Sequence, residues 1–237
     1  MPNSSAQRRY PRHPLVLSIL YKSKEPAPAK VGVGWTRDVS DGGACLELAE
    51  PLPFATRLSV ILQTDQGSLG VEGKVVWVGG PVAGGGGVLH GVAFRDATPE
   101  QLRALWALIA RKGQARQAAV RVPVKLAVLC RPKGDAGPPL QGETGDVSRE
   151  GLSVYLPQLL PAATPIEITL PTRRDPLTLE ARVVWVESPE ARTPGQPIRH
   201  GLRFTNLSWA HELTLGLLLA EVPAEAAPKK GGRPHGQ

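Results

Sequence analysis

The sequence is poor in cysteine and aromatic residues, and it contains no long apolar run. Its 237 residues include two cysteines, Cys45 and Cys130, which are too few for a disulfide framework or a cysteine-rich metal site. We expect both to be buried thiols in strands. The apolar stretch of about 18 residues that a transmembrane helix needs is missing, and the polar N-terminus lacks the pattern of a secretory signal. These features predict a cytoplasmic protein without membrane insertion.

Catalytic signatures are missing as well. There is no glycine-rich phosphate loop followed by Lys-Ser/Thr, no nucleophile elbow and no acid pair with a catalytic pattern. His90 and His200 have no companion residues that suggest a metal, so we expect them at strand edges. We therefore predict a protein that is not an enzyme, with no catalytic residue, no metal site and no cofactor.

Charge and aromatic content bear on nucleic-acid binding. The net charge is +7, but no run of lysine and arginine is long enough to form a DNA-binding stripe. Aromatic residues make up 5% of the chain, whereas proteins that bind single strands stack bases on exposed rings. We expect Trp77 and Trp185 to pack on the core or on a helix instead. Nucleic acid is therefore not the expected partner.

An internal repeat is the most informative feature of the sequence. Matching segments follow the same order in both halves: Asp38-Val39-Ser40 and Asp146-Val147-Ser148, Val75-Val76-Trp77-Val78 and Val183-Val184-Trp185-Val186, His90-Gly91 and His200-Gly201. The repeat predicts two copies of one domain, at 1–113 and 114–222. The remaining residues, 223–237, have the composition of a disordered tail.

Both copies have the same predicted elements, six strands followed by one helix. Short runs rich in Val, Leu and Ile alternate with Gly, Pro, Asp and Ser clusters, which is typical of strands and turns. Six closely spaced strands suggest a closed antiparallel β-barrel, which leaves no exposed sheet edge. The predicted strands are 15–21, 31–37, 44–48, 57–62, 69–78 and 88–94 in the first copy, and 124–130, 140–145, 152–156, 165–170, 177–187 and 198–204 in the second.

The start of the first helix has a capping signature. Thr98 suits the N-cap, Pro99 the first helical position, and Gln101 completes a capping box. The second helix is expected at about 208–220. The fold class is thus mainly β, with two tandem barrels that are each followed by a helix.

A basic arm and a polar turn carry the candidate binding chemistry. The arm is Arg8-Arg9-Tyr10-Pro11-Arg12, and the turn is Asp38-Val39-Ser40-Asp41-Gly42-Gly43. Guanidinium groups bind phosphate oxygens with paired hydrogen bonds and can also pair with guanine or stack on it. A carboxylate accepts hydrogen bonds from guanine N–H groups, and a glycine lets the backbone come close. Together, the two segments suit a guanine nucleotide.

The Arg-x-x-x-Arg arm, the Asp-x-Ser-x-x-Gly turn and the barrel of six strands resemble the PilZ domain family. PilZ domains are bacterial receptors for the second messenger cyclic di-GMP. The last strand of the family tends to carry a glycine and an aromatic residue, as Gly91 and Phe94 do here. The resemblance implies that the first copy binds cyclic di-GMP through these residues: Arg8, Arg9, Arg12, Asp38, Ser40 and Gly43.

The second copy keeps only part of this pattern. It has the turn and one arm arginine, and Gln117 stands where the first arm arginine would be. The resemblance therefore implies a complete site in the first copy and leaves binding by the second copy open. The corresponding residues are Arg121, Asp146, Ser148 and Gly151.

The resulting hypothesis is a cyclic di-GMP receptor that passes the signal to a partner protein. Ligand would fasten the N-terminal arm against the barrel and change the surface that the partner meets. Two alternatives remain open at this point: a PilZ-like scaffold in motility or pilus regulation that binds no ligand, and a basic small barrel that binds nucleic acid. The sequence identifies neither the downstream partner nor the oligomeric state.

Overall fold

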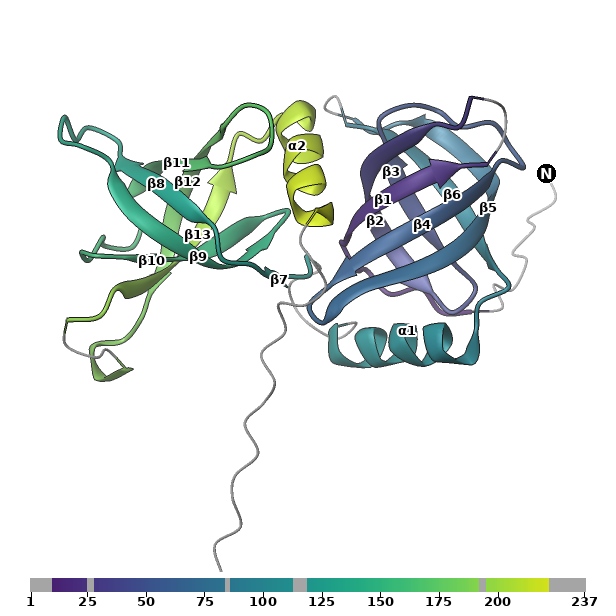
Figure 1. The fold of residues 1–237 in the computed structure, drawn as a ribbon, viewed down its shortest axis with the longest axis horizontal. Coiled ribbons are helices and arrows are strands. Elements are labelled where there is room, and N and C mark those ends of the chain that lie inside the picture. Colours follow the sequence, from purple (N-terminus) through teal and green to yellow (C-terminus); the bar gives the residue numbers. More distant parts are fainter. Residues whose placement is uncertain (1–9, 25–27, 84–85, 113–118, 192–194, 222–237) are drawn as a thin grey trace, which may run out of the picture.

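The structure is a computed structural model, and it describes residues 10–24, 28–83, 86–112, 119–191 and 195–221. Two β-barrels stand side by side, and helix α2 (Trp209–Ala220) lies between them (Figure 1). Helix α1 (Pro99–Lys112) lies along one end of the first barrel (Figure 1). The predicted fold class is therefore confirmed. The predicted tail, at 223–237, lies outside the described residues.

The first barrel is closed by six antiparallel strands in the order β1-β2-β3-β6-β5-β4. Within it, side chains that alternate along each strand meet in one apolar core, for which Leu46, Leu58 and Val75 are typical buried members. The strands are β1 (Ser18–Ser23), β2 (Val31–Ser40), β3 (Gly43–Leu48), β4 (Arg57–Thr64), β5 (Gly67–Pro81) and β6 (Val88–Arg95).

The second barrel repeats this topology. Its sheet runs β10-β13-β12-β11-β8-β9 and closes through the β9–β10 pairing, while short β7 pairs with the end of β9. The strands are β7 (Val122–Pro123), β8 (Ala127–Pro132), β9 (Leu140–Ser148), β10 (Gly151–Leu156), β11 (Pro165–Leu170), β12 (Leu177–Val186) and β13 (Ile198–Thr205), with the short 3-10 helix η1 (Pro189–Ala191) before β13.

Helix α1 starts with the predicted capping box. The Thr98 hydroxyl accepts a hydrogen bond from the Gln101 amide at 3.2 Å, and the Gln101 side chain accepts one from the Thr98 amide at 2.7 Å. These two bonds satisfy N–H groups that have no partner within the helix. Leu105 and Leu108 then face the first barrel and are buried in its core.

Two predictions about strand residues are wrong. Trp77 and Trp185 are not packed away but are 48% and 40% exposed, because a β-bulge beside each one turns two successive residues outward. His90 and His200 are not at strand edges but fully buried, because β6 and β13 are paired on both sides. The exposed rings also remove one of the two reasons against nucleic-acid binding given above.

Helix α2 belongs to the second copy but packs on the first barrel. Ser18 donates its hydroxyl hydrogen to the Gly216 carbonyl at 2.7 Å, and the Trp35 indole donates to the Glu212 carbonyl at 3.2 Å. Trp35 is 1% exposed and belongs to the same apolar cluster as the core of the second barrel. Helix α2 therefore connects the two barrels through hydrogen bonds and a common apolar cluster. Among the described residues, no helix is long and apolar enough to cross a membrane.

Candidate ligand-binding site

Backbone pairing places the arm beside the turn of the first barrel. His13 and Val39 exchange both backbone hydrogen bonds, each at 2.9 Å, so the end of the arm runs antiparallel to the end of β2. In the second copy, β7 takes the same place, because Val122 pairs with Val147 and Pro123 with Asp146. This pairing brings the residue before His13, Arg12, next to Asp38.

Arg12 and Asp38 form the charged centre of the site. The Arg12 Nη1 donates to Asp38 Oδ1 at 3.0 Å and lies 3.4 Å from Oδ2. The side chains are 43% and 28% exposed, so both remain accessible to a ligand. An ion pair this exposed adds at most about 1 kcal/mol to stability. The contribution of this ion pair to stability is therefore small. Its importance for a binding site is that it presents an arginine and a carboxylate side by side.

The turn itself is shaped by Ser40 and Gly43. The Ser40 hydroxyl donates to the Gly43 carbonyl at 3.1 Å and is buried in the turn. A side chain at Gly43 would put its Cβ 2.2 Å from the Val92 carbonyl oxygen, so the close approach of β6 requires glycine here. In this structure both residues shape the turn that follows Asp38, and direct contact of either with a ligand stays a prediction.

Tyr10 is a further contact between arm and turn that the sequence did not indicate. Its ring lies over Gly42, where a Cβ would approach a ring carbon to 2.6 Å. Because Gly42 has no side chain, the Tyr10 ring packs directly on the backbone of the turn. Arg8 and Arg9, the other two predicted arm residues, lie outside the described residues.

The second copy brings Arg121 and Asp146 together in the same way. Arg121 Nη1 donates to Asp146 Oδ1 at 2.7 Å. Ser148 donates to the Gly151 carbonyl at 3.0 Å, and a Cβ at Gly151 would come 2.0 Å from the Leu202 carbonyl oxygen. The turns of the two copies are thus built alike, down to the reason for the glycine.

Two residues that the sequence reasoning missed complete the second arrangement. Arg199, on β13, donates from Nη2 to Asp146 Oδ2 at 2.9 Å, and the Ser153 hydroxyl donates to the same oxygen at 2.8 Å. Burial by itself would raise the pKa of Asp146, but the hydrogen bonds from Arg121 and Ser153 and the charges of both arginines outweigh it and lower that pKa. Comparison of the copies residue by residue would have found the difference, because Arg199 corresponds to Leu89.

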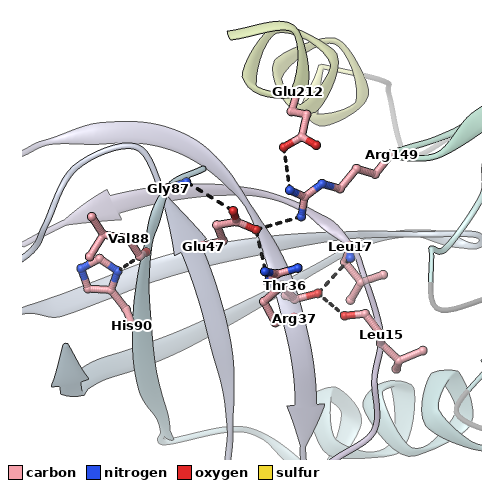
Figure 2. Close-up of polar contacts among 10 residues, drawn as sticks. All are labelled: Leu15, Leu17, Thr36, Arg37, Glu47, Gly87, Val88, His90, Arg149 and Glu212. Carbon is pink, nitrogen blue, oxygen red and sulfur yellow. Dashed lines mark hydrogen bonds and ion pairs between the residues drawn. The ribbon is translucent and has the colours of Figure 1, made fainter. Parts of the chain in front are cut away.

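A cluster of ion pairs around the buried Glu47 joins the first site to the second barrel. Glu47, which is 1% exposed, accepts from Arg149 at 2.9 Å and lies 3.4 Å from Arg37 Nε, and Arg149 also donates to Glu212 of α2 at 2.6 Å (Figure 2). Arg37 directly precedes Asp38 and is the bulged residue of β2. Arg149, which lies in the turn of the second copy, therefore contacts the first barrel. We call Arg37, Glu47, Arg149 and Glu212 the interbarrel cluster.

A comparison with family models identifies two matches to one family. The PilZ domain matches at residues 6–111 and again at residues 115–221. No curated protein sequence matches the chain.

Several solved structures are similar to the chain at low identity. Bacillus subtilis inhibitor of motility (MotI/DgrA) is 12% identical, with 86% of this chain and 94% of that chain covered and a TM-score of 0.38. YcgR from Escherichia coli in complex with c-di-GMP is 11% identical, with 86% and 82% covered and a TM-score of 0.37. The K. pneumonia MrkH–c-di-GMP complex is 10% identical, with 86% of both chains covered and a TM-score of 0.37.

Proposed function

The chain belongs to the PilZ domain family, and from this premise we propose that its first barrel is a receptor for cyclic di-GMP. One observation carries the proposal: Arg12 and Asp38 are 26 residues apart in sequence, yet they are paired at 3.0 Å on an accessible face. An arginine for phosphate and a carboxylate for guanine N–H groups are thereby presented side by side. The complete arm of the first copy adds Arg8 and Arg9 to this pair.

We propose that part of the N-terminal arm already contacts the barrel before the ligand binds. Tyr10 already rests on Gly42, and His13 is already paired with Val39. We propose that the ligand fastens the rest of the arginine arm, including Arg8 and Arg9, against the barrel from these contacts. Contacts that are formed before the ligand binds lower the entropic cost of binding.

The signal is proposed to pass through the interbarrel cluster. Arg37 directly precedes Asp38 on β2. It lies beside Glu47, which binds Arg149 of the second barrel. If a ligand bound at Asp38 accepts a hydrogen bond from the Arg37 guanidinium, the contact between Arg37 and Glu47 would weaken. The change would then reach the contact between the barrels, and through it the surface offered to a partner protein.

Isothermal titration calorimetry with cyclic di-GMP tests the site. We expect the wild type to bind, and Arg8→Ala, Arg12→Ala and Asp38→Ala each to weaken binding. A lost charge-assisted hydrogen bond costs about 1.5–3 kcal/mol, or about tenfold to a hundredfold in Kd. Arg103→Ala is the matched control, because this arginine forms an exposed ion pair with Glu100 on α1, and its binding should equal that of the wild type.

Two results would count against the proposal. A wild type that binds no cyclic di-GMP contradicts the receptor function. Tight binding by the wild type and by all three site variants contradicts the assignment of the site. Titrations with GTP and with cyclic di-AMP on the wild type measure how far the site selects a cyclic dinucleotide with guanine bases.

A further inference from the structure

Matched positions around the two turns differ in a consistent way. Ser153, Tyr155 and Arg199 of the second barrel correspond in the repeat to Cys45, Glu47 and Leu89 of the first, and Cys45 pairs with Asp38 as Ser153 pairs with Asp146. Cross-strand pairing confirms the neighbours, because Ser153 pairs with Asp146 and Tyr155 with Arg199. At these three positions the second barrel has a hydroxyl, a phenol ring and a guanidinium where the first has a thiol, a carboxylate and a leucine, whereas the tryptophan on the neighbouring strand is present in both, as Trp77 and Trp185.

The hydrogen-bonding capacity of the two carboxylates differs accordingly. Among the described residues, Asp38 has one partner, Arg12, and its Oδ2 is held only by the long 3.4 Å contact. Asp146 has three partners: Arg121 on Oδ1 at 2.7 Å, and Arg199 and Ser153 on Oδ2 at 2.9 and 2.8 Å. Asp146 is also the more buried of the two, at 16% exposed against 28%.

The Arg199 guanidinium lies where a planar ring would stack. Its carbon is 5.7 Å from the centre of the Tyr155 ring and 5.6 Å from that of Trp185, both within the range of cation–π contacts. A Cβ on Gly201 would come 2.0 Å from Trp185 Nε1, so the indole lies flat on the glycine of β13. Among the described residues the buried Arg199 Nε has no hydrogen-bond partner, and the side chain as a whole is 38% exposed, so its contacts with Asp146, Ser153 and the two rings are what hold it.

We infer that Arg199 is a built-in occupant of the second site and that it keeps cyclic di-GMP out of the second barrel. Its N–H groups donate to the carboxylate oxygen of Asp146, and its guanidinium plane lies near the aromatic rings. A guanine base would need the same two interactions, a hydrogen bond to the carboxylate and stacking on a ring. A ligand would have to displace a guanidinium that is tethered and already in place, so the tether competes at high effective concentration. This inference rests on the proposed function of the first barrel and limits it to one ligand site per chain.

Replacement of Arg199 by the residue of the first copy tests the inference. In a background of Arg12→Ala together with Asp38→Ala, which removes both members of the charged pair of the first site, we expect no binding of cyclic di-GMP that calorimetry can detect. Addition of Arg199→Leu should open the second site, with Arg121 and Asp146 as its charged pair. Because that site has the arm arginine matching Arg12 but not the one matching Arg8, its affinity should be close to that of the Arg8→Ala protein with an intact first barrel.

Two further variants guard against misfolding and against a nonspecific effect. Arg199→Gln keeps a donor for Asp146 but lacks the full guanidinium, and it should also open the site in the background of Arg12→Ala with Asp38→Ala. Arg182→Leu changes an exposed arginine on the neighbouring strand β12 and should open nothing. Circular dichroism melts establish which variants are folded.

Each result separates the inference from the proposed function. A wild type that does not bind contradicts the function. If the wild type binds but the protein with Arg12→Ala and Asp38→Ala still binds through Asp146, or if the folded Arg199→Leu and Arg199→Gln proteins do not bind, only the inference is overturned. Binding gained by both Arg199 variants and not by Arg182→Leu supports it.

Discussion

At the scale of single residues, the two buried histidines show how a polar ring can serve a barrel. The His90 Nε2 accepts a hydrogen bond from the Leu52 amide at 2.9 Å, so the proton is on Nδ1, which donates to the Val88 carbonyl at 3.0 Å. The same pair of contacts holds His200, with Leu160 and Ile198 as partners. Each histidine therefore fixes a loop to the last strand of its barrel and needs to be neutral to do so.

Because His90 is neutral in the folded protein, we expect the stability of the fold to decrease at acidic pH. Burial lowers the pKa of His90, although the bond to Val88 opposes the shift. The unfolded chain therefore binds a proton more readily than the folded one, so the contribution is complete above about pH 6.5 and is lost as pH falls below it. We expect the free energy of unfolding to drop more steeply between pH 7.5 and 5.5 in the wild type than in His90→Gln.

Urea unfolding at the two pH values measures this difference. One proton contributes a slope of up to about 1.4 kcal/mol per pH unit. Glutamine keeps an acceptor for the Leu52 amide but does not titrate, and His200 is present in both proteins, so its effect cancels. Parallel pH profiles for the two proteins would mean that His90 titrates alike in the folded and unfolded chains.

Much of this residue-level detail could not be read from the sequence. The strands, the capping box and the arm–turn pair follow from local patterns and were predictable. The outward-facing Trp77 and Trp185 depend on β-bulges, which shift the alternation without a clear sequence mark. Arg199 meets Asp146 only because β13 and β10 pair, and such long-range contacts are not encoded in any local pattern.

At the scale of elements, the turn of the second copy has acquired a structural task. Arg149 lies between Trp35 and Trp209, 5.4 and 5.9 Å from their ring centres, and binds Glu47 and Glu212. Burial would lower the pKa of Arg149, but the bonds to Glu212 and Glu47 outweigh it and raise that pKa. Both carboxylates therefore favour the charged form of the guanidinium.

Loss of this arginine should destabilise the protein strongly. Arg149→Ala leaves Glu47 buried with fewer partners, and removal of one member of a buried ion pair costs about 3–5 kcal/mol. Arg103→Ala, which breaks an exposed pair, should cost less than about 1 kcal/mol. Urea denaturation of both variants provides the comparison, and equal costs would show that the interbarrel cluster adds nothing to stability.

At the scale of the whole molecule, the two copies depend on each other through α2. The face of the first barrel that contains Trp35 is covered by a helix from the end of the second copy. A Cβ on Gly216 would be in ordinary van der Waals contact with the Trp35 ring at 3.5 Å, so the further carbons of a large branched side chain would meet the ring. The repeat visible in the sequence therefore does not divide the structure into two self-sufficient halves.

Separate halves should consequently find each other in solution. We expect residues 1–113 and residues 114–237, produced as two polypeptides, to form a 1:1 complex in size-exclusion chromatography. Gly216→Leu in the second polypeptide should prevent it, because the new side chain meets Trp35. Halves that migrate independently, or a complex that tolerates Gly216→Leu, would show that the α2 contact does not hold the barrels together.

The position of α2 also has a consequence for synthesis of the chain. About 180 residues separate Trp35 from Gly216, and translation at 5–20 residues per second takes roughly 10–40 s to cover them. During that time the first barrel can close, but its Trp35 face has nothing to cover it. A nascent chain therefore exposes an apolar patch around Trp35 until α2 has been made, so completion of the first barrel depends on a segment synthesised about 180 residues later.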